Sequence, residues 1–275
     1  MEEKILFTSE SVSEGHPDKV CDQIADAILD ACLAQDSRSH VACEVFTTKE
    51  FILIGGEITT KAKVDYAQIA RGVLKDIGYT DAKLGIGCDS CQIKVLVNTQ
   101  SPDIEMGVDR GDPLQQGAGD QGIMFGYATN ETAGYMPLPI SIAHKLVRVA
   151  TSLRKEGKFP HARPDMKSQV TIDYTDPDAP RIDTVLMSIQ HDEDADMDAF
   201  KAFVHDRIMV PVAESFGLNS DFRTLINPTG RFVTGGPAGD TGLTGRKLIV
   251  DTYGGSARHG GGAFSGKDPP KAERS

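Results

Sequence analysis

The sequence has no long hydrophobic run, no tryptophan and no excess of positive charge. No segment approaches the roughly 18 uninterrupted apolar residues that a membrane-spanning helix needs. The N-terminus begins with acidic residues and lacks the apolar core of a signal peptide. From these absences we expect a cytoplasmic protein that does not act at a membrane.

The net charge of the chain limits which ligands it is expected to bind. The 275 residues include 40 aspartates and glutamates against 29 lysines and arginines, which gives a formal charge of −11. Non-specific binding to nucleic acid needs a basic surface that neutralises phosphates, so the acidic balance argues against a nucleic-acid partner. Any anionic ligand must therefore be held by a local cluster of basic side chains.

Cysteine is scarce and odd in number, which fits a reducing compartment better than a disulfide scaffold. The five residues are Cys21, Cys32, Cys43, Cys88 and Cys91. Cys88 and Cys91 have the spacing of a redox or zinc motif, but they precede an apolar, strand-like run and do not begin a helix. The sequence favours two buried thiols over a redox or metal role.

Hydrophobic spacing predicts an order of strand, strand, helix and strand that occurs twice along the chain. We expect helices over 17–33, 64–77 and 197–216, the last one broken or kinked at Pro211. Strands are expected over 41–47, 51–58, 91–98, 168–174, 182–190, 224–227 and 231–234. Residues 247–251 are expected to begin a third unit, and 24 residues then remain. Such a pattern is typical of a shortened chain.

Two stretches show no regular periodicity. Residues 99–122 are rich in Gly, Asp, Gln and Pro, and an internal loop of this length is usually a functional lid or a linker. The segment 234–275 carries 11 of the 28 glycines. The acidic run 191–198 favours a solvated loop leading into a helix N-terminus over a metal site.

A first candidate for chemistry is Gly15-His16-Pro17-Asp18-Lys19. It places an imidazole at the start of a helix, where free N–H groups and the helix dipole favour a phosphate. Asp18 in the first turn is suited to hold Mg²⁺ against that phosphate. Taken alone, the motif favours an ordinary capped helix with a surface histidine.

The glycine-rich segment 235–247 is more specific, because its glycines allow close approach to a ligand and it ends in Arg246 and Lys247. It is not a Walker P-loop, since Lys247 is followed by Leu248. Segment 258–268 repeats the combination of glycines and cations. A flexible glycine-rich surface explains one such segment better than two in succession.

Two carboxylates lie in or just after hydrophobic strands. Glu44 is inside an apolar run and Glu57 follows another. A charge in such a place costs desolvation unless a partner or a cation compensates it. For Glu44, an outward-facing position on an alternating strand is an equal alternative.

These segments together resemble the S-adenosylmethionine synthetase (methionine adenosyltransferase) family. The matching stretches are 7–19, 55–60, 100–104, 117–122, 124–131, 226–232, 242–247 and 251–269. They follow the order found in the family and span essentially the whole chain.

The resemblance implies an α+β fold of three related sheet-and-helix units around a pseudo-threefold axis. The expected units are 4–102, 116–234 and an incomplete third unit at 236–275, with a mobile gate loop at 100–122. These boundaries are approximate because the units interleave. Subunits of the family share active sites, so a homodimer or tetramer is expected.

The implied reaction joins ATP and L-methionine into S-adenosylmethionine by in-line attack of sulfur on C5′. The released triphosphate is then cleaved to pyrophosphate and phosphate. Because the methionine sulfur is already a good nucleophile, the enzyme has to position it and stabilise charge on the departing triphosphate.

The resemblance also assigns residues. Catalytic roles fall to His16, Lys167, Arg246 and Lys267, which also contact ATP. Further ATP contacts fall to Asp165, Arg231, Phe232, Asp240, Lys247 and Ala263. Methionine contacts fall to Glu57, Gln100, Asp120, Asp240 and Lys271. Two Mg²⁺ ions per site are expected, with Asp18 and Glu273 as ligands, and Glu44 is expected to bind K⁺.

This sequence departs from the family at Glu273, where the family has an aspartate. The longer glutamate must fold back to keep the tight octahedral geometry of Mg²⁺. Two other functions remain open at this stage: a non-catalytic chain that regulates a full-length synthetase, and a partial enzyme that cleaves only triphosphate.

Overall fold

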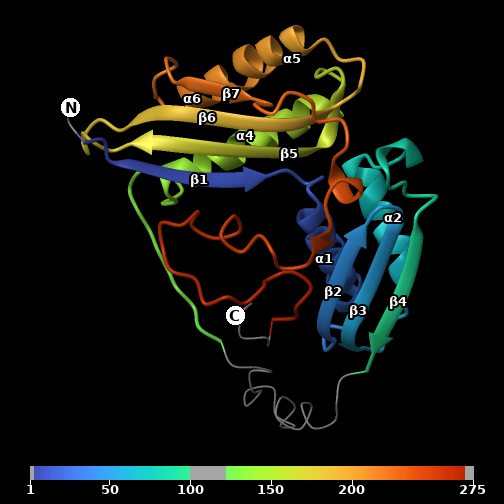
Figure 1. Ribbon diagram of the computed structural model, residues 1–275. Helices are drawn as coiled ribbons and strands as arrows, with labels where there is room; N and C mark the ends of the chain where they lie inside the picture. Colours follow the sequence, from blue (N-terminus) through green and yellow to red (C-terminus); the bar gives the residue numbers. More distant parts are fainter. Residues whose placement is uncertain (1–2, 100–121, 270–275) are drawn as a thin grey trace. The chain divides into compact units, whose positions relative to one another are not determined.

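The strands form two separate four-stranded sheets, each built on a long antiparallel hairpin (Figure 1). The computed structural model describes residues 3–99 and 122–269. It divides into two units. The first unit comprises Met1–His16, Gly126–Gly235 and Ile249–Arg258, and the second comprises Pro17–Phe125, Gly236–Leu248 and His259–Ser275.

The first unit contains the sheet β1-β5-β6-β7. Its strands are β1 (Leu6–Val12), β5 (Ala162–Asp173), β6 (Arg181–His191) and β7 (Arg223–Ile226). Its helices are α4 (Leu138–Lys155), α5 (Met197–Val204) and α6 (Val210–Ser215), the last two joined by a π-helical turn over His205–Met209. Buried side chains of α4, such as Leu146, pack in one core with Val170 and Met187 of the sheet and Ile208 of the π-helical turn.

Three features of this unit test the secondary structure that was expected from the sequence. The break near Pro211 is confirmed, because the π-turn immediately precedes this proline, which has no N–H for the helix ladder. The strand expected over 231–234 is wrong, since Phe232 makes its backbone contacts with His191 alone. Helix α4 was not expected, although Ile142 and Leu146 have the four-residue spacing of a buried helical face.

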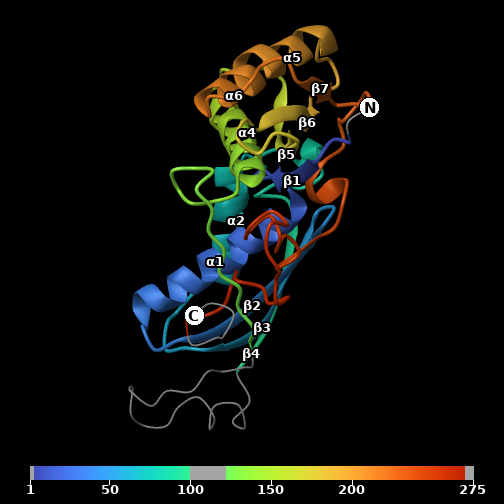
Figure 2. The same cartoon turned by 90° about the vertical axis from the view of Figure 1, so that its left-hand side faces the viewer.

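The second unit contains the sheet β4-β3-β2-β8. Its strands are β2 (His40–Thr48), β3 (Phe51–Thr59), β4 (Gln92–Asn98) and β8 (Gly242–Leu243). Its helices are α1 (Pro17–Gln35) and α2 (Tyr66–Ile77), with short 3₁₀ turns over Ala82–Leu84 and Gly236–Ala238. Helix α1 lies along one face of this sheet (Figure 2), where Ile24 and Ile28 pack with Val45 and Ile54.

The two units share one topology. In each, a helix precedes an antiparallel hairpin, a second helical segment follows, and the next strand runs parallel to the second hairpin strand. A fourth strand pairs antiparallel with the first hairpin strand, β1 in one unit and β8 in the other. The α+β class and the recurrent order are therefore confirmed.

The strand-like start of a third unit expected at 247–251 is wrong. Residues 248–255 form consecutive turns. Their backbone groups are satisfied locally, since the amide of Gly254 donates to the carbonyl of Ile249 at 3.0 Å. A local turn leaves these groups unavailable for a strand ladder.

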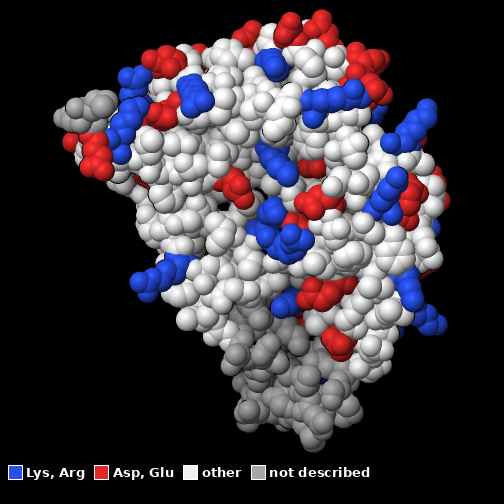
Figure 3. Space-filling view, viewed as in Figure 1, with Lys and Arg blue, Asp and Glu red and all other residues white. Residues whose placement is uncertain are grey.

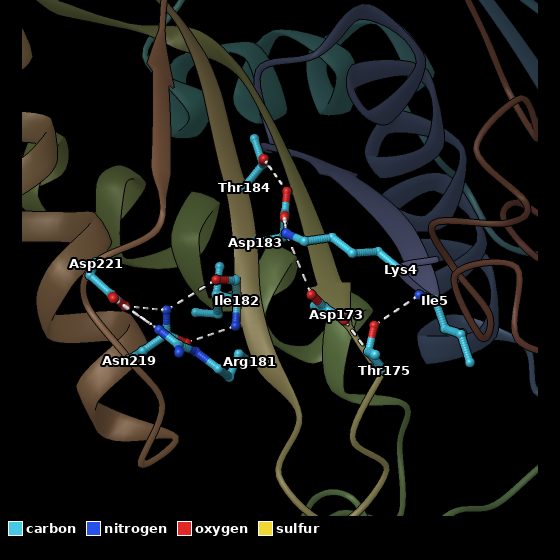
Figure 4. A network of polar contacts seen from close by, with 10 residues as sticks. All are labelled: Lys4, Ile5, Asp173, Thr175, Arg181, Ile182, Asp183, Thr184, Asn219 and Asp221. Atoms are coloured by element: carbon cyan, nitrogen blue, oxygen red, sulfur yellow. Dashed lines mark hydrogen bonds and ion pairs between the residues drawn. The ribbon is translucent and has the colours of Figure 1, made fainter. Parts of the chain in front are cut away.

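A polar network ties together one end of the first unit's sheet (Figure 4). Nζ of Lys4 lies 2.8 Å from Oδ1 of Asp183 and 3.5 Å from Oδ2 of Asp173, and Arg181 pairs with Asp221 at 2.8 Å. Hydrogen bonds from Lys4 and from Thr184 lower the pKa of Asp183, and the bond to Asp183 raises the pKa of Lys4. Solvent screens these exposed pairs, so each adds little stability.

All five cysteines are free and buried. Desolvation raises the pKa of Cys88 and of Cys91. The guanidinium of Arg71 donates to the carbonyl oxygens of Cys88 at 2.5 Å and Cys91 at 3.1 Å, which fixes the turn that carries both thiols. The expectation of two buried thiols is confirmed.

Acidic and basic side chains are interspersed on the face drawn in Figure 3. Among the described residues, no helix is both long and apolar enough to cross a membrane.

Candidate functional site

In the first unit, the loop that follows β1 is clamped onto the start of β5. Ser13 donates its amide to the carbonyl of Met166 at 2.9 Å, and its hydroxyl accepts from the amide of Met166 at 2.9 Å. The same hydroxyl donates to the carbonyl of Pro164 at 2.7 Å. A Cβ on Gly15 would lie 2.4 Å from atoms of Pro164, so this close approach requires glycine.

This clamp brings three expected site residues to one end of the β1–β5 pair. His16 ends the clamped loop, and Asp165 and Lys167 lie in the first half of β5. His16 and Asp165 are each 3% exposed, whereas Lys167 is exposed and pairs in register with Val12. A buried carboxylate and a buried imidazole in one corner of a sheet form a polar site.

Arg231 and Phe232 belong to the same end of this sheet. The amide of Phe232 donates to Nε2 of His191 at 3.1 Å, and the amide of His191 donates to the carbonyl of Phe232 at 2.9 Å. His191 ends β6 opposite the first residue of β5. Arg231 is exposed and forms an ion pair with Glu193. The first unit thus gathers five of the expected nucleotide contacts at one sheet end.

In the second unit, both cation-bearing glycine segments line the same edge of β2. Strand β8 pairs with the C-terminal half of β2, and the amide of Thr244 continues the pairing with the carbonyl of Val45 at 3.0 Å. Lys267 forms an antiparallel bridge with Ala42, in the N-terminal half of β2. Segments 242–247 and 266–268 are therefore neighbours along one strand. The expected phosphate-binding residues Arg246, Lys247 and Lys267 lie on these two segments.

Asp18, in the first turn of helix α1, contacts the cations of segment 242–247. Its side chain is 2% exposed; Oδ2 lies 2.6 Å from Nζ of Lys247, and Oδ1 accepts from the amide of Leu243 at 3.0 Å. Nε of Arg246 is 3.7 Å from the same carboxylate. The expected Mg²⁺ ligand and two expected phosphate-binding cations are thus in one cluster.

Lys267 extends this cluster toward the carboxylates of the hairpin. Partial desolvation raises the pKa of Glu44, the nearby charge of Lys267 opposes that rise, and Asp22 and Glu57 add to it. Glu57 pairs in register with Ala42, the residue that bridges to Lys267. Lys267 and the carboxylates of Asp22 and Glu57 thus act in opposite directions on the pKa of Glu44. Asp22 is itself paired with Lys19 at 3.0 Å.

Ala263 and Asp240 border the same segments. A Cβ placed on Gly245 would lie 2.4 Å from Cβ of Ala263, so Ala263 packs directly against the backbone before Arg246. Asp240 is exposed, and its amide closes a turn on the carbonyl of Gly236 at 3.1 Å.

Three family models match the chain from end to end. They describe the S-adenosylmethionine synthetase N-terminal domain at residues 4–102, the central domain at 115–232 and the C-terminal domain at 234–275. The chain belongs to the S-adenosylmethionine synthetase family. Family membership confirms the resemblance drawn from the motifs and supports the methionine adenosyltransferase class.

Its relatives include two proteins named S-adenosylmethionine synthase. The protein of Mesoplasma florum is 64% identical over 270 residues, covering 98% of this chain and 71% of the relative. That of Mycoplasma capricolum subsp. capricolum is 64% identical over 273 residues, covering 99% of this chain and 70% of the relative. These similarities favour the enzyme over the regulatory and triphosphatase-only alternatives.

The synthetase family generally depends on Mg²⁺ and K⁺. The residues present fit both ions. The ammonium of Lys247 against buried Asp18 shows that this carboxylate stabilises a cation, and Mg²⁺ is commonly bound by one or two carboxylates together with substrate phosphates. The raised pKa of Glu44 shows a carboxylate that a monovalent cation would stabilise.

Four expected site residues of the synthetase lie outside the described residues. They are Gln100, Asp120, Lys271 and Glu273, and almost all of the expected gate loop at 100–122 lies there too. Their roles stay predictions.

A surface group in the first unit also has metal-ligand chemistry. Ligand atoms of His161, Asp192 and Asp194 lie within 4.8 Å of one another. Asp192 is already paired with Nε of Arg163 at 2.5 Å. Asp196 caps α5, as expected for an acidic loop that leads into a helix. This exposed group lacks the burial of the residues at the sheet end.

Sequence reasoning missed two carboxylates that contact the synthetase's glycine segments. Asp22 accepts from the amide of Gly245 at 2.8 Å, and Asp26 accepts from the amide of Gly266 at 2.9 Å. Asp22 lies four residues after Asp18 and Asp26 lies a further four residues on, and this spacing was the signal that would have identified them, because such residues share a helix face.

Proposed function

We propose that this chain forms S-adenosylmethionine from ATP and L-methionine by in-line attack of sulfur on C5′, and then cleaves the triphosphate. The observation that carries the proposal is the cluster of Arg246, Lys247 and Lys267 along β2, with Asp18 beside it. Several fixed cations around one polyphosphate stabilise the charge that develops on the leaving group. An acidic chain of net charge −11 would bind such an anion only at a local basic cluster.

The chain's own residues have distinct tasks in this proposal. Arg246, Lys247 and Lys267 bind phosphate oxygens, Lys167 adds a further cation, and His16 donates a hydrogen bond to the triphosphate near C5′. Positioning the methionine sulfur in line with C5′ then lowers the barrier without a protein nucleophile. Mg²⁺, when bound, supplies additional charge neutralisation on the polyphosphate.

The remaining assignments follow the family. Ring stacking by Phe232 and polar contacts of Asp165, Arg231 and Asp240 hold the nucleoside. Ala263 lines the same pocket. The methionine contacts are Glu57, Gln100, Asp120, Asp240 and Lys271. Asp18 and Glu273 hold the two Mg²⁺ ions, and Glu44 holds K⁺.

The proposal includes assembly as a homodimer or tetramer with shared active sites. Support comes from the face of the second unit's sheet opposite α1. Phe46 and Leu53 pair in register on that face, and Leu96 continues it on β4 with 51% of its surface exposed. These apolar side chains, which share the face with Glu44, Glu57 and Lys94, favour burial against a partner.

The proposed organisation is three pseudo-threefold units, 4–102, 116–234 and 236–275, with the third incomplete. Its topological support is the order of elements that recurs in the two units of the structure. We place the enzyme in the cytoplasm, where its five free thiols remain reduced.

The test uses the 275-residue chain purified free of any host synthetase. It is incubated with ATP, L-methionine, Mg²⁺ and K⁺, and S-adenosylmethionine and phosphate are measured by mass spectrometry and a phosphate assay. We expect both products, and we expect His16→Ala to abolish the sulfonium product. His205→Ala, at a half-buried histidine of the π-turn, is the matched control and should retain activity.

Two outcomes would contradict the proposal. Phosphate release from added triphosphate without sulfonium would identify a triphosphatase. A folded chain that forms neither product would overturn the synthetase activity of this chain.

A further inference from the structure

Helix α1 carries a row of carboxylates along its length. Asp18, Asp22 and Asp26 are spaced four residues apart, so they lie one above the other on one face of the helix. Asp18 and Asp22 are each 2% exposed, and Asp26 is half-buried. Buried carboxylates on consecutive turns are costly unless each is compensated.

Backbone amides of the glycine segments provide that compensation. Oδ1 of Asp22 accepts from the amide of Gly245 at 2.8 Å, and Oδ1 of Asp26 accepts from the amide of Gly266 at 2.9 Å. Hydrogen bonds to a charged acceptor are about twice as strong as neutral ones. Lys19, one turn before Asp22, pairs with its Oδ2 at 3.0 Å.

Each amide belongs to the residue immediately before a cation. Gly245 precedes Arg246, and Gly266 precedes Lys267. A carboxylate that anchors the amide of the glycine before a cation restrains the backbone that carries the cationic side chain.

Glycine is required at both contacts. Gly245 has φ +76° and Gly266 has φ +73°. A Cβ on Gly266 would lie 2.8 Å from Cβ of Ala25 on α1 and 2.4 Å from the carbonyl oxygen of Cys43 on β2. The close approach of Gly266 to the helix and the strand therefore requires glycine, and at Gly245 the positive φ and the 2.4 Å that would separate an added Cβ from Cβ of Ala263 do the same.

We propose that Asp22 and Asp26 are positioning residues that hold the phosphate-binding cations in place before the substrate arrives. This inference rests on the proposed function, because the ligand of these cations is the polyphosphate. Asp22 holds the backbone at Arg246 and Lys247, and Asp26 holds it at Lys267. Fixing these backbones in advance reduces the ordering cost of binding the triphosphate.

The carboxylates also offset repulsion within the cation cluster. Arg246, Lys247 and Lys267 line one edge of β2, and like charges close together disfavour the empty site. The carboxylates of α1 place negative charge beside these cations: Nζ of Lys247 contacts Oδ2 of Asp18 at 2.6 Å, and Asp22 and Asp26 bond to the adjoining glycine amides.

The experiment compares Asp22→Ala and Asp26→Ala with the wild-type chain and with Asp30→Ala. Asp30 is the next residue in the row but is exposed, which makes it a matched control. Asp22→Asn and Asp26→Asn retain an oxygen acceptor and test rescue. Tripolyphosphate affinity is measured by calorimetry, and amide hydrogen exchange is followed by mass spectrometry. Steady-state kinetics give KM for ATP and kcat.

We expect selective effects. Asp22→Ala should accelerate exchange in 243–248, and Asp26→Ala should do so in 264–269. Each should weaken tripolyphosphate binding by about tenfold, as expected for loss of one charge-assisted hydrogen bond. The asparagine variants should stay within about threefold of wild type, and Asp30→Ala should match wild type. KM for ATP should rise more than kcat falls, which a general loss of folded protein would not produce.

Three results distinguish failure of the positioning role from failure of the proposed function. Wild-type tripolyphosphate affinity in both alanine variants would overturn the positioning role while the proposed function stands. Equal losses in the alanine and asparagine variants would overturn the hydrogen-bond basis. If an alanine variant does not fold, the folded asparagine variant is compared with wild type, and a loss of tripolyphosphate affinity of about tenfold in it would overturn the same basis. A wild-type chain that binds no tripolyphosphate and forms no sulfonium would overturn the proposed function and the positioning role together.

Discussion

Replacing Asp18 with asparagine isolates the ion pair between Asp18 and Lys247. The Oδ1 acceptor for the amide of Leu243, 3.0 Å away, is kept, while the charge that faces Nζ of Lys247 at 2.6 Å is removed. The substitution thus tests the cation-binding capacity of this carboxylate apart from its backbone hydrogen bond.

The magnitude follows from burial. Removing one partner of a fully buried ion pair costs about 3–5 kcal/mol, whereas an exposed pair is worth under about 1 kcal/mol. The side chain of Asp18 is 2% exposed and that of Lys247 is 19% exposed. We therefore expect Asp18→Asn to lower the free energy of unfolding by about 1–3 kcal/mol.

A double-mutant cycle with Lys247→Met separates the pair from other effects. Unfolding in urea is followed by far-UV circular dichroism, because the chain has no tryptophan. Each single variant leaves one charge without its partner in the pair, and the double variant removes both. The coupling energy should be about 1–2 kcal/mol.

A coupling energy near zero would refute this reasoning. It would mean that solvent screens the pair despite the burial of Asp18. Lys83→Met, at an exposed lysine of the second unit, controls for the general loss of a lysine charge and should leave the unfolding midpoint unchanged.

Three further predictions concern other parts of the chain. The carboxyl pKa values of Asp173 and Asp183 are lowered in the folded chain, so their stabilisation is present above the unfolded value near 4 and is lost as the pH falls through the folded values. The difference in Tm between wild type and Lys4→Met should therefore shrink as the pH drops from about 5 to 2, and a constant difference would contradict this. Burial raises the pKa of Cys21 and of Cys43 to about 12. A thiol reagent at pH 8 should therefore label all five cysteines only after unfolding. Rapid labelling of the native chain would be inconsistent with the structure. Gly254→Ala should lower the free energy of unfolding by about 2–4 kcal/mol, because Gly254 has φ +62° and a Cβ there would lie 2.6 Å from Cβ of Ile140. Gly134→Ala is the control: it has open space around it and should leave the free energy of unfolding nearly unchanged.

Secondary structure was predictable where periodicity reflects burial on one face. The helix expected over 17–33 is α1, and the runs over 41–47 and 51–58 are the hairpin β2–β3. The prediction failed at 231–234, where Phe232 bonds to His191 and the carbonyl of Val233 accepts from the side chain of Gln190, without forming a strand. Strand formation there depends on a neighbour that local sequence does not specify.

The candidate site was predictable in part. The glycine and cation motifs at 235–247 and 258–268, together with the family resemblance, named Arg246 and Lys267 from the sequence. The role of Asp22 was predictable only in part. Its four-residue spacing from Asp18 marks a shared helix face, but Gly245, whose amide it accepts, is 223 residues away in sequence.

The sequence by itself determined the family, the α+β class, the helix α1 and the chemical types gathered in the cation-rich segments. Local spacing and motif order suffice for these properties. Only the tertiary structure decided which groups meet. Asp22 and Gly245 are 223 residues apart in sequence, and Asp26 and Gly266 are 240 apart. Such contacts arise because β2 recruits both glycine segments to one edge, and strand pairing between distant segments is a property of the whole fold.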